Sequence, residues 1–134
     1  MTWWENVGGH PVSDSILVVE DDESSRQMMT VMLELAGFTV ESAQDGGEAL
    51  SRLLVDPRPR LVMLDIMMPV VDGLTILRWV KTNPVTAAIP VVMVSAKSDP
   101  LARHTAELHG AAGFIVKPFA PDKAIATIHG ILAA

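Results

Sequence analysis

The feature that most constrains this chain is an apolar run that ends on a carboxylate. Residues 61–64 read Leu-Val-Met-Leu, and Asp65 follows them. An apolar run of this length, bounded by turn residues, is typical of a strand buried on both faces, so we predict that Asp65 emerges at the strand's carboxyl end. Ligands bind at that edge in an open parallel α/β sheet. The run therefore predicts a functional edge, to which other strands can contribute.

Apolar segments of strand and helix spacing alternate along the whole chain. Strands are expected at residues 16–19, 38–42, 61–64, 89–94 and 114–116, with a turn at 45–47. Helices are predicted by apolar stripes at Met28, Val31, Met32 and Leu35; Ala49, Leu50, Leu53 and Leu54; Leu74, Leu77 and Val80; Leu101, Thr105 and Leu108; and Ile125, Ile128, Ile131 and Leu132. This alternation predicts a doubly wound α/β fold, a parallel sheet with helices on both faces. The flavodoxin-like (βα)5 arrangement, with strand order 2-1-3-4-5, is the leading candidate.

The domain is expected to span residues 15–134. Residues 1–14 contain Gly8, Gly9 and Pro11 without apolar periodicity, so we expect a loosely ordered N-terminal extension. Trp3 and Trp4 are unusual in such a segment, and packing on the domain or on a partner is the alternative.

Composition excludes several classes of function. The longest apolar runs are far shorter than the ~18 residues of a membrane span, and the chain has no cysteine, which fits a cytoplasmic protein. A net charge of −6, with ten scattered basic residues, argues against direct nucleic-acid binding.

Polar side chains follow four of the expected strands at the same edge. These residues are Glu20 and Asp21, Asp65, Ser95 and Lys117. Three carboxylates held close together would repel one another, so they predict a bound cation, and hard oxygen ligands favour Mg²⁺. A carboxylate beside Mg²⁺ is a competent nucleophile toward a phosphoryl group, whose oxygens the lysine and the serine hydroxyl would contact.

Five separated motifs carry this pattern: Glu20-Asp21, Asp65-Ile66-Met67-Met68-Pro69, Asp72-Gly73, Ser95-Ala96 and Lys117-Pro118-Phe119. In this order, over about residues 15–134, the chain resembles the receiver domain of two-component response regulators. The resemblance implies that Asp65 accepts a phosphoryl group from a histidine kinase or a histidine phosphotransfer protein. It also implies that Asp21, Asp65 and the Met67 carbonyl hold Mg²⁺, for which Mn²⁺ could substitute, with Glu20 acting through water. The Lys117-Pro118 peptide would be cis.

The resemblance further implies a switch. Ser95 and Phe114 would shift the surface of the fourth helix, fifth strand and fifth helix toward an unknown protein target. Met67 and Lys97 occupy positions that tune how easily water attacks the phosphoryl group, and our hypothesis is that both shield it. Catalysis would be limited to the chain's own phosphorylation and dephosphorylation.

The same residues bear on three alternatives to a stand-alone, phosphoryl-accepting receiver. A degenerate receiver acting as a docking module would have lost an acid, the hydroxyl or the lysine, and none is lost. A phosphohydrolase resembling the haloacid dehalogenases needs an acid two residues after its nucleophile, where Met67 stands. A stand-alone regulator, similar to the chemotaxis and phosphorelay members, is favoured over a domain excised from a larger regulator or hybrid kinase.

Overall fold

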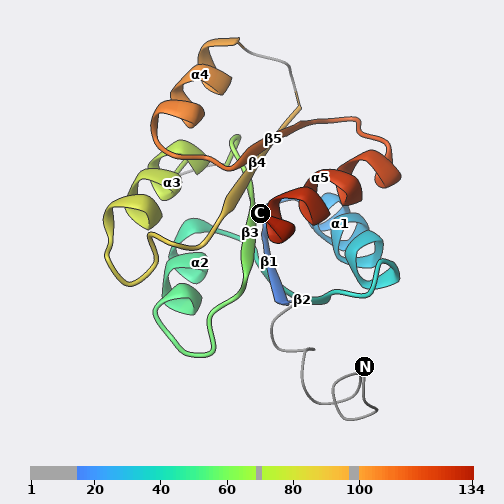
Figure 1. The fold of residues 1–134 in the computed structure, drawn as a ribbon, viewed down its shortest axis with the longest axis horizontal. Coiled ribbons are helices and arrows are strands. Elements are labelled where there is room, and N and C mark those ends of the chain that lie inside the picture. The colour runs from blue at the N-terminus through green and yellow to red at the C-terminus, as the bar shows by residue number, and fades with distance from the viewer. Residues whose placement is uncertain (1–14, 69–70, 97–99) are drawn as a thin grey trace.

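Five parallel strands form one sheet in the computed structural model, which describes residues 15–68, 71–96 and 100–134. The strand order is β2-β1-β3-β4-β5, which confirms the predicted order (Figure 1). The strands are β1 (Ser15–Val19), β2 (Thr39–Ala43), β3 (Leu61–Asp65), β4 (Val91–Ser95) and β5 (Gly113–Val116). Their bounds differ from the expected ones by up to two residues.

Five helices cover the two faces of the sheet (Figure 1). They are α1 (Glu23–Leu35), α2 (Gly46–Leu53), α3 (Gly73–Thr82), α4 (Pro100–Leu108) and α5 (Pro121–Ala133). One apolar core joins the sheet to α2, α3 and α4, and a second joins it to α1 and α5. Every residue of β1, β3 and β4 is buried, because alternate side chains enter the two cores.

Aspartate side chains begin three of the helices. Asp22, Asp45 and Asp72 accept hydrogen bonds from backbone amides three residues further on, at 2.8, 2.8 and 2.9 Å. Such N-caps satisfy amides that the first turn of a helix leaves unpaired. The turn predicted at residues 45–47 is therefore wrong in part, since α2 already begins at Gly46 behind its aspartate cap.

The buried face of α1 differs from the predicted stripe. Met29 and Leu33 enter the core with Met32, whereas Met28 is 51% exposed and Leu35 is 84% exposed. Two overlapping stripes on this helix have helical spacing, and the sheet covers only one of them. In α4 the two leucines of the expected stripe, Leu101 and Leu108, are exposed, and Ala106 is the buried residue.

Within the described ranges, none of the helices combines the length and the apolar composition that crossing a membrane requires. The N-terminal extension, residues 1–14, and Lys97, which is predicted to shield the phosphoryl group, lie outside the described residues.

Candidate functional site

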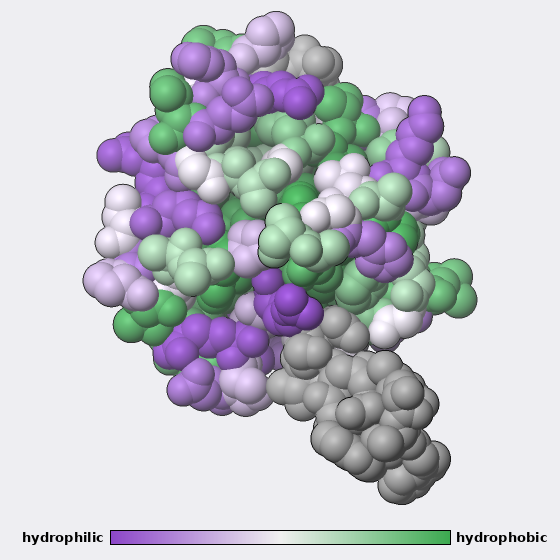
Figure 2. Space-filling model, viewed as in Figure 1, coloured by the Kyte–Doolittle hydropathy of each residue, from purple (hydrophilic) through white to green (hydrophobic). Residues whose placement is uncertain are grey.

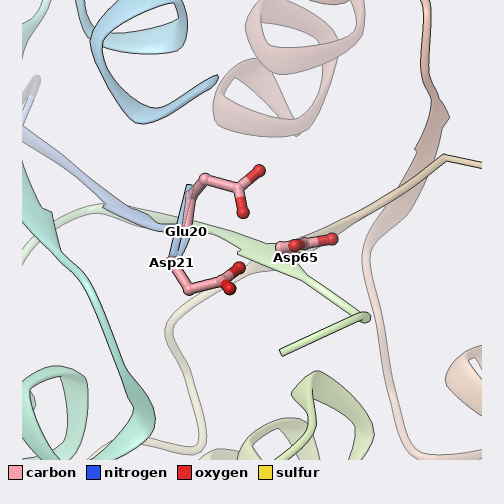
Figure 3. Close-up of side chains that lie close together, drawn as sticks. All are labelled: Glu20, Asp21 and Asp65. Atoms are coloured by element: carbon pink, nitrogen blue, oxygen red, sulfur yellow. The ribbon is translucent and has the colours of Figure 1, made fainter. Parts of the chain in front are cut away.

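Three carboxylates meet at the carboxyl edge of the sheet. Glu20 and Asp21 follow β1, and Asp65 ends the neighbouring strand β3, where Val19 and Leu64 are in register. One oxygen from each carboxylate lies within 4.8 Å of the others. Figure 3 shows the two β1 side chains extending from the strand end on the side where Asp65 lies. Three hard oxygen donors at this separation suit a small divalent cation.

The cation that the chain itself supplies is Lys117. Its Nζ forms an ion pair with Glu20, which is 1% exposed. Burial raises the pKa of Glu20, but hydrogen bonds to Asp65 and Lys117 outweigh it and hold that pKa below its usual range. Glu20 therefore remains charged inside the site because the lysine stabilises it.

Asp65 behaves in the opposite way. Burial raises the pKa of Asp65 to about 7, and the hydrogen bond and negative charge of Glu20 add to that rise. Lys117 only partly offsets it. Burial, followed by interaction with Glu20, also raises the pKa of Asp21. Without a bound cation, Asp65 and Asp21 therefore retain protons more readily than isolated carboxyls would, whereas Glu20 does not.

Ser95 and Lys117 complete the edge on the far side of Asp65. Ser95 ends β4, is 5% exposed, and is in register with Val116. The backbone amide of Lys117 donates to the Ser95 carbonyl at 2.6 Å. Asp65 is in register with Val94, so Ser95 directly follows the residue that lies beside Asp65 on β4. The Lys117-Pro118 peptide is cis, as the resemblance implies.

The match to known proteins agrees with this arrangement. Residues 16–129 match the family model described as the response regulator receiver domain. The chain belongs to this family.

Solved structures of similar proteins share the fold of this receiver domain. The Vibrio cholerae chemotaxis protein CheY4 is 32% identical with a TM-score of 0.82, over 87% of this chain and 97% of that chain. A putative response regulator from Chloroflexus aurantiacus is 30% identical with a TM-score of 0.85, over 90% of this chain and 98% of that chain. Receiver domains are the phosphoryl-accepting switches of two-component systems.

Curated relatives are longer proteins. The transcriptional regulatory protein GltR of Pseudomonas aeruginosa is 34% identical over 88% of this chain and 48% of its own length. The phosphate regulon protein PhoB of the same species is 33% identical over 90% of this chain and 52% of its own. The receiver domain thus spans about half the length of the curated relatives it matches.

Two further residues, Gly73 and Arg26, shape the site of the receiver domain, and the sequence alone does not predict these roles. A Cβ atom on Gly73 would lie 2.2 Å from the Asp65 carbonyl oxygen, so α3 begins directly against the strand that carries Asp65. Arg26 in α1 donates from Nη1 to the backbone carbonyls of Glu20 and Asp21, at 3.0 and 3.4 Å. For Gly73, the signal in the sequence was its position directly after Asp72, the N-cap of α3. For Arg26, it was its position as the first basic residue of the chain, in the first turn of the helix that follows the acids.

Met67 and Phe114 take different positions in the receiver domain. The Met67 amide donates to Asp65 Oδ1 at 3.3 Å, and the Met67 side chain is 71% exposed. Phe114 in β5 is half-buried against the core that contains α3 and α4. The guanidinium carbon of Arg103 in α4 lies 5.6 Å from the centre of its ring. The ring therefore connects the fifth strand to the fourth helix.

Proposed function

We propose that Asp65 of this receiver domain is the residue that accepts the phosphoryl group, from a phosphohistidine of a histidine kinase or a histidine phosphotransfer protein. The observation that supports this is the convergence of Glu20, Asp21 and Lys117 on a buried Asp65 at the carboxyl edge of the sheet. The unit that performs this function would be the domain over residues 15–134.

The residues present fit a magnesium ion. Asp21, Asp65 and the Met67 carbonyl would hold it, with Glu20 acting through water, and Mn²⁺ could substitute. When bound, the ion would neutralise charge on the phosphoryl oxygens. The donor set consists only of hard oxygen atoms, which suits Mg²⁺ rather than a softer metal.

The chain's own residues would divide the chemistry between them. The Asp65 carboxylate attacks phosphorus, so that an O–P bond forms as the N–P bond of the phosphohistidine breaks and the imidazole nitrogen keeps the electron pair. Lys117 turns from Glu20 toward a phosphoryl oxygen, and the Ser95 hydroxyl donates to another. Catalysis by the chain is confined to this transfer and to hydrolysis of its product.

The signal would pass from the edge to one surface. Ser95 moves toward the phosphoryl group, and Phe114 on the adjacent strand fills the space that this movement changes. Phe114 of β5 is in register with Met93 of β4, and Ser95 lies two residues after Met93 on the same strand. Ser95 and Phe114 are therefore diagonal neighbours across β4 and β5. The surface of α4, β5 and α5 would then present a different shape to a protein target.

Phosphorylation by a small donor tests the assignment of Asp65. With acetyl phosphate and Mg²⁺, intact-mass spectrometry should show one phosphoryl group on the parent and none on Asp65→Asn. Asp56→Asn is the matched control, because Asp56 lies in an exposed loop away from the edge. Equal labelling of Asp65→Asn and the parent would overturn the assignment.

The persistence of the phosphoryl group tests the roles of Met67 and Lys97. If both side chains shield it from water, the double variant Met67→Ala with Lys97→Ala should lose the label several-fold faster than the parent. Met28→Ala is the control, because Met28 is a half-exposed methionine on α1. An unchanged rate in the double variant would rule out shielding.

A further inference from the structure

Met67 is the most exposed methionine in the part of the chain that the structure describes. The chain has no cysteine, so thioethers are its only sulfur groups. Of the seven methionines in the described ranges, Met67 is 71% exposed and Met28 is 51% exposed. The other five are at most 9% exposed: Met29, Met32, Met63, Met68 and Met93. A dissolved oxidant therefore reaches Met67 more readily than it reaches the methionines of the core.

Exposure alone does not single out Met67. In Figure 2 hydrophobic residues lie among hydrophilic ones over the face that is drawn, and isolated apolar side chains on a protein surface are common. Met67 differs from an exposed leucine in its sulfur, which is polarisable and can be oxidised. It differs from Met28 in its position, two residues after the proposed phosphoryl acceptor Asp65.

The backbone holds Met67 beside the acidic site. Its amide donates to Asp65 Oδ1 at 3.3 Å. On one side of it, the amide of Ile66 donates to a carbonyl of β4 at 2.9 Å, and the Ile66 carbonyl accepts from the first amide of α3 at 3.0 Å. On the other side, Met68 is buried in the core that contains α2 and α3. Because both neighbours are anchored, a Met67 side chain that changes its polarity stays next to Asp65.

We infer that Met67 is a site of reversible oxidation by peroxides, and that its oxidation shortens the lifetime of a phosphoryl group on Asp65. The inference rests on the proposed function, because it requires Asp65 to be the acceptor and the Met67 side chain to shield the phosphoryl group from water.

The oxidation transfers one oxygen atom to sulfur. A lone pair of the Met67 sulfur attacks one oxygen of hydrogen peroxide, and an S–O bond forms as the O–O bond breaks. The leaving hydroxide takes the proton of the transferred oxygen and becomes water. Sulfur loses two electrons, which the peroxide gains. Methionine sulfoxide reductases reverse the step, with electrons from a thiol.

The sulfoxide changes how water meets the phosphoryl group. A thioether sulfur is only a weak hydrogen-bond acceptor, so the unmodified side chain retains little water. Oxidation converts it into a polar group whose oxygen accepts hydrogen bonds. Since Met67 is held beside Asp65, an apolar screen becomes an acceptor that retains water next to the phosphoryl group. Hydrolysis is therefore faster in the oxidised protein.

Peptide mapping tests where the oxygen is added. Trypsin releases residues 61–78 as one peptide, because basic residues stand only before it and at its end. The peptide contains Met63, Met67 and Met68, of which only Met67 is exposed. After brief treatment of the folded chain with hydrogen peroxide, fragment masses should place one oxygen on Met67 and none on its neighbour Met68. Equal oxidation of these two residues, or none at Met67, would overturn the inference.

The lifetime of the phosphoryl group tests the consequence. The full chain is oxidised with hydrogen peroxide, freed of it with catalase, and then phosphorylated with acetyl phosphate and Mg²⁺. After the donor is removed, intact-mass spectrometry should show that the oxidised protein loses its phosphoryl group several-fold faster than the same protein without oxidation. Treatment with methionine sulfoxide reductases should restore the slower loss.

Met67→Leu is the matched variant, because leucine is apolar and of similar size but has no sulfur. Each protein is compared with itself before and after peroxide, so the variant and the parent need not start from the same rate. The two rates should be equal in Met67→Leu. In Met28→Leu, which lacks the other exposed thioether of the described residues, peroxide should still accelerate the loss.

Failure of the inference and failure of the proposed function give different results. If the parent acquires no phosphoryl group before oxidation, the proposed function is wrong and the inference falls with it. If the parent is labelled but complete oxidation of Met67 leaves the rate unchanged, the inference alone is wrong. Acceleration by peroxide in Met67→Leu would also contradict it, because another methionine would then be responsible.

Discussion

At Gly73 the chain has no room for a side chain. A Cβ atom there would meet the Asp65 carbonyl oxygen at 2.2 Å and the Ile66 Cα at 2.8 Å, both of them backbone atoms that cannot turn aside. The Gly73 amide also donates to the Ile66 carbonyl at 3.0 Å. The close start of α3 therefore fixes the backbone on which Asp65 is carried.

Replacing this glycine should damage both the fold and the site. We expect Gly73→Ala to lower the free energy of unfolding by ~1–3 kcal/mol, the usual cost of forcing extra atoms into a packed region. Gly47→Ala is the control, because its Cβ would meet only the Asp45 side chain, at 3.5 Å. Urea unfolding of the two variants checks this, and equal stabilities would contradict it.

The raised pKa of Asp65 makes a prediction about pH. A carboxyl whose pKa is about 7 in the folded protein binds its proton more tightly there than in the unfolded chain. The free energy of unfolding of the metal-free protein should therefore fall as pH rises from about 4 to 7, and remain low above pH 7. Asp65→Asn removes this loss, so it should stabilise the metal-free protein by a few kcal/mol at pH 8 and by much less at pH 5, since each unit of pKa shift corresponds to ~1.4 kcal/mol.

Urea unfolding in a chelator at the two pH values measures the effect. Asp56→Asn should change stability little at either pH, because Asp56 is a largely exposed loop residue. If Asp65→Asn stabilised equally at pH 5 and pH 8, the buried carboxyl would not be responsible.

At the scale of elements, the sequence predicted the strands better than the helix faces. Fully buried strands leave uninterrupted apolar runs, so β3 could be predicted from its run, whereas the strand order rested on the alternation of strands and helices and in part on the family resemblance. On α1 two stripes overlap, and only the tertiary contact decides that Met29 rather than Met28 is buried. The predicted acids Glu20, Asp21 and Asp65 do lie together at the carboxyl edge of the sheet. The hydrogen bonds from Arg26 to backbone carbonyls could not be predicted, because they depend on how α1 is oriented and not on the spacing of residues in the sequence.

Arg52 is the connection between α2 and its surroundings. It forms an ion pair with Glu41 of β2, in which Nη2 lies 2.8 Å from Oε1, and it donates to the carbonyls of Val55 and Pro57 at 3.0 and 2.7 Å. One side chain thus holds a helix, a strand and the following loop together.

Removing the Arg52 guanidinium should destabilise the protein more than neutralising the Glu41 carboxylate. We expect Arg52→Met to lower the free energy of unfolding by ~1–2 kcal/mol, and Glu41→Gln to cost less, because Arg52 keeps its two backbone acceptors. The hydrogen bond from Arg52 lowers the pKa of Glu41, so its contribution is present above the unfolded pKa and is lost as pH falls through the folded one. Denaturant titrations of both variants check the order, and a larger loss in Glu41→Gln would reverse it.

At the scale of the whole molecule, the acids are neighbours only when the sheet has formed. Asp21 and Asp65 come from strands separated by more than forty residues, so an ion that binds both recognises the folded state. We expect Mg²⁺ to raise the melting temperature, since at 100 times its dissociation constant a ligand adds ~2.7 kcal/mol. Asp21→Asn should lose most of this rise.

Ionic strength is the control for that prediction. Sodium chloride at matched ionic strength screens the acids without bridging them, so it should raise the melting temperature less. An equal rise with the two salts would mean that charge screening, and not a bound ion, stabilises the fold.

The ion pair between Lys117 and Glu20 joins residues 97 positions apart in the chain. Synthesis proceeds from the amino end at ~5–20 residues per second, and Asp65 leaves the ribosome well before Lys117 does. A nascent chain that has made only β1 to β4 holds its acids without the lysine that stabilises Glu20. If Asp65 accepts the phosphoryl group as proposed, the site becomes complete only after β5, and competence for phosphorylation reports that synthesis has passed Lys117.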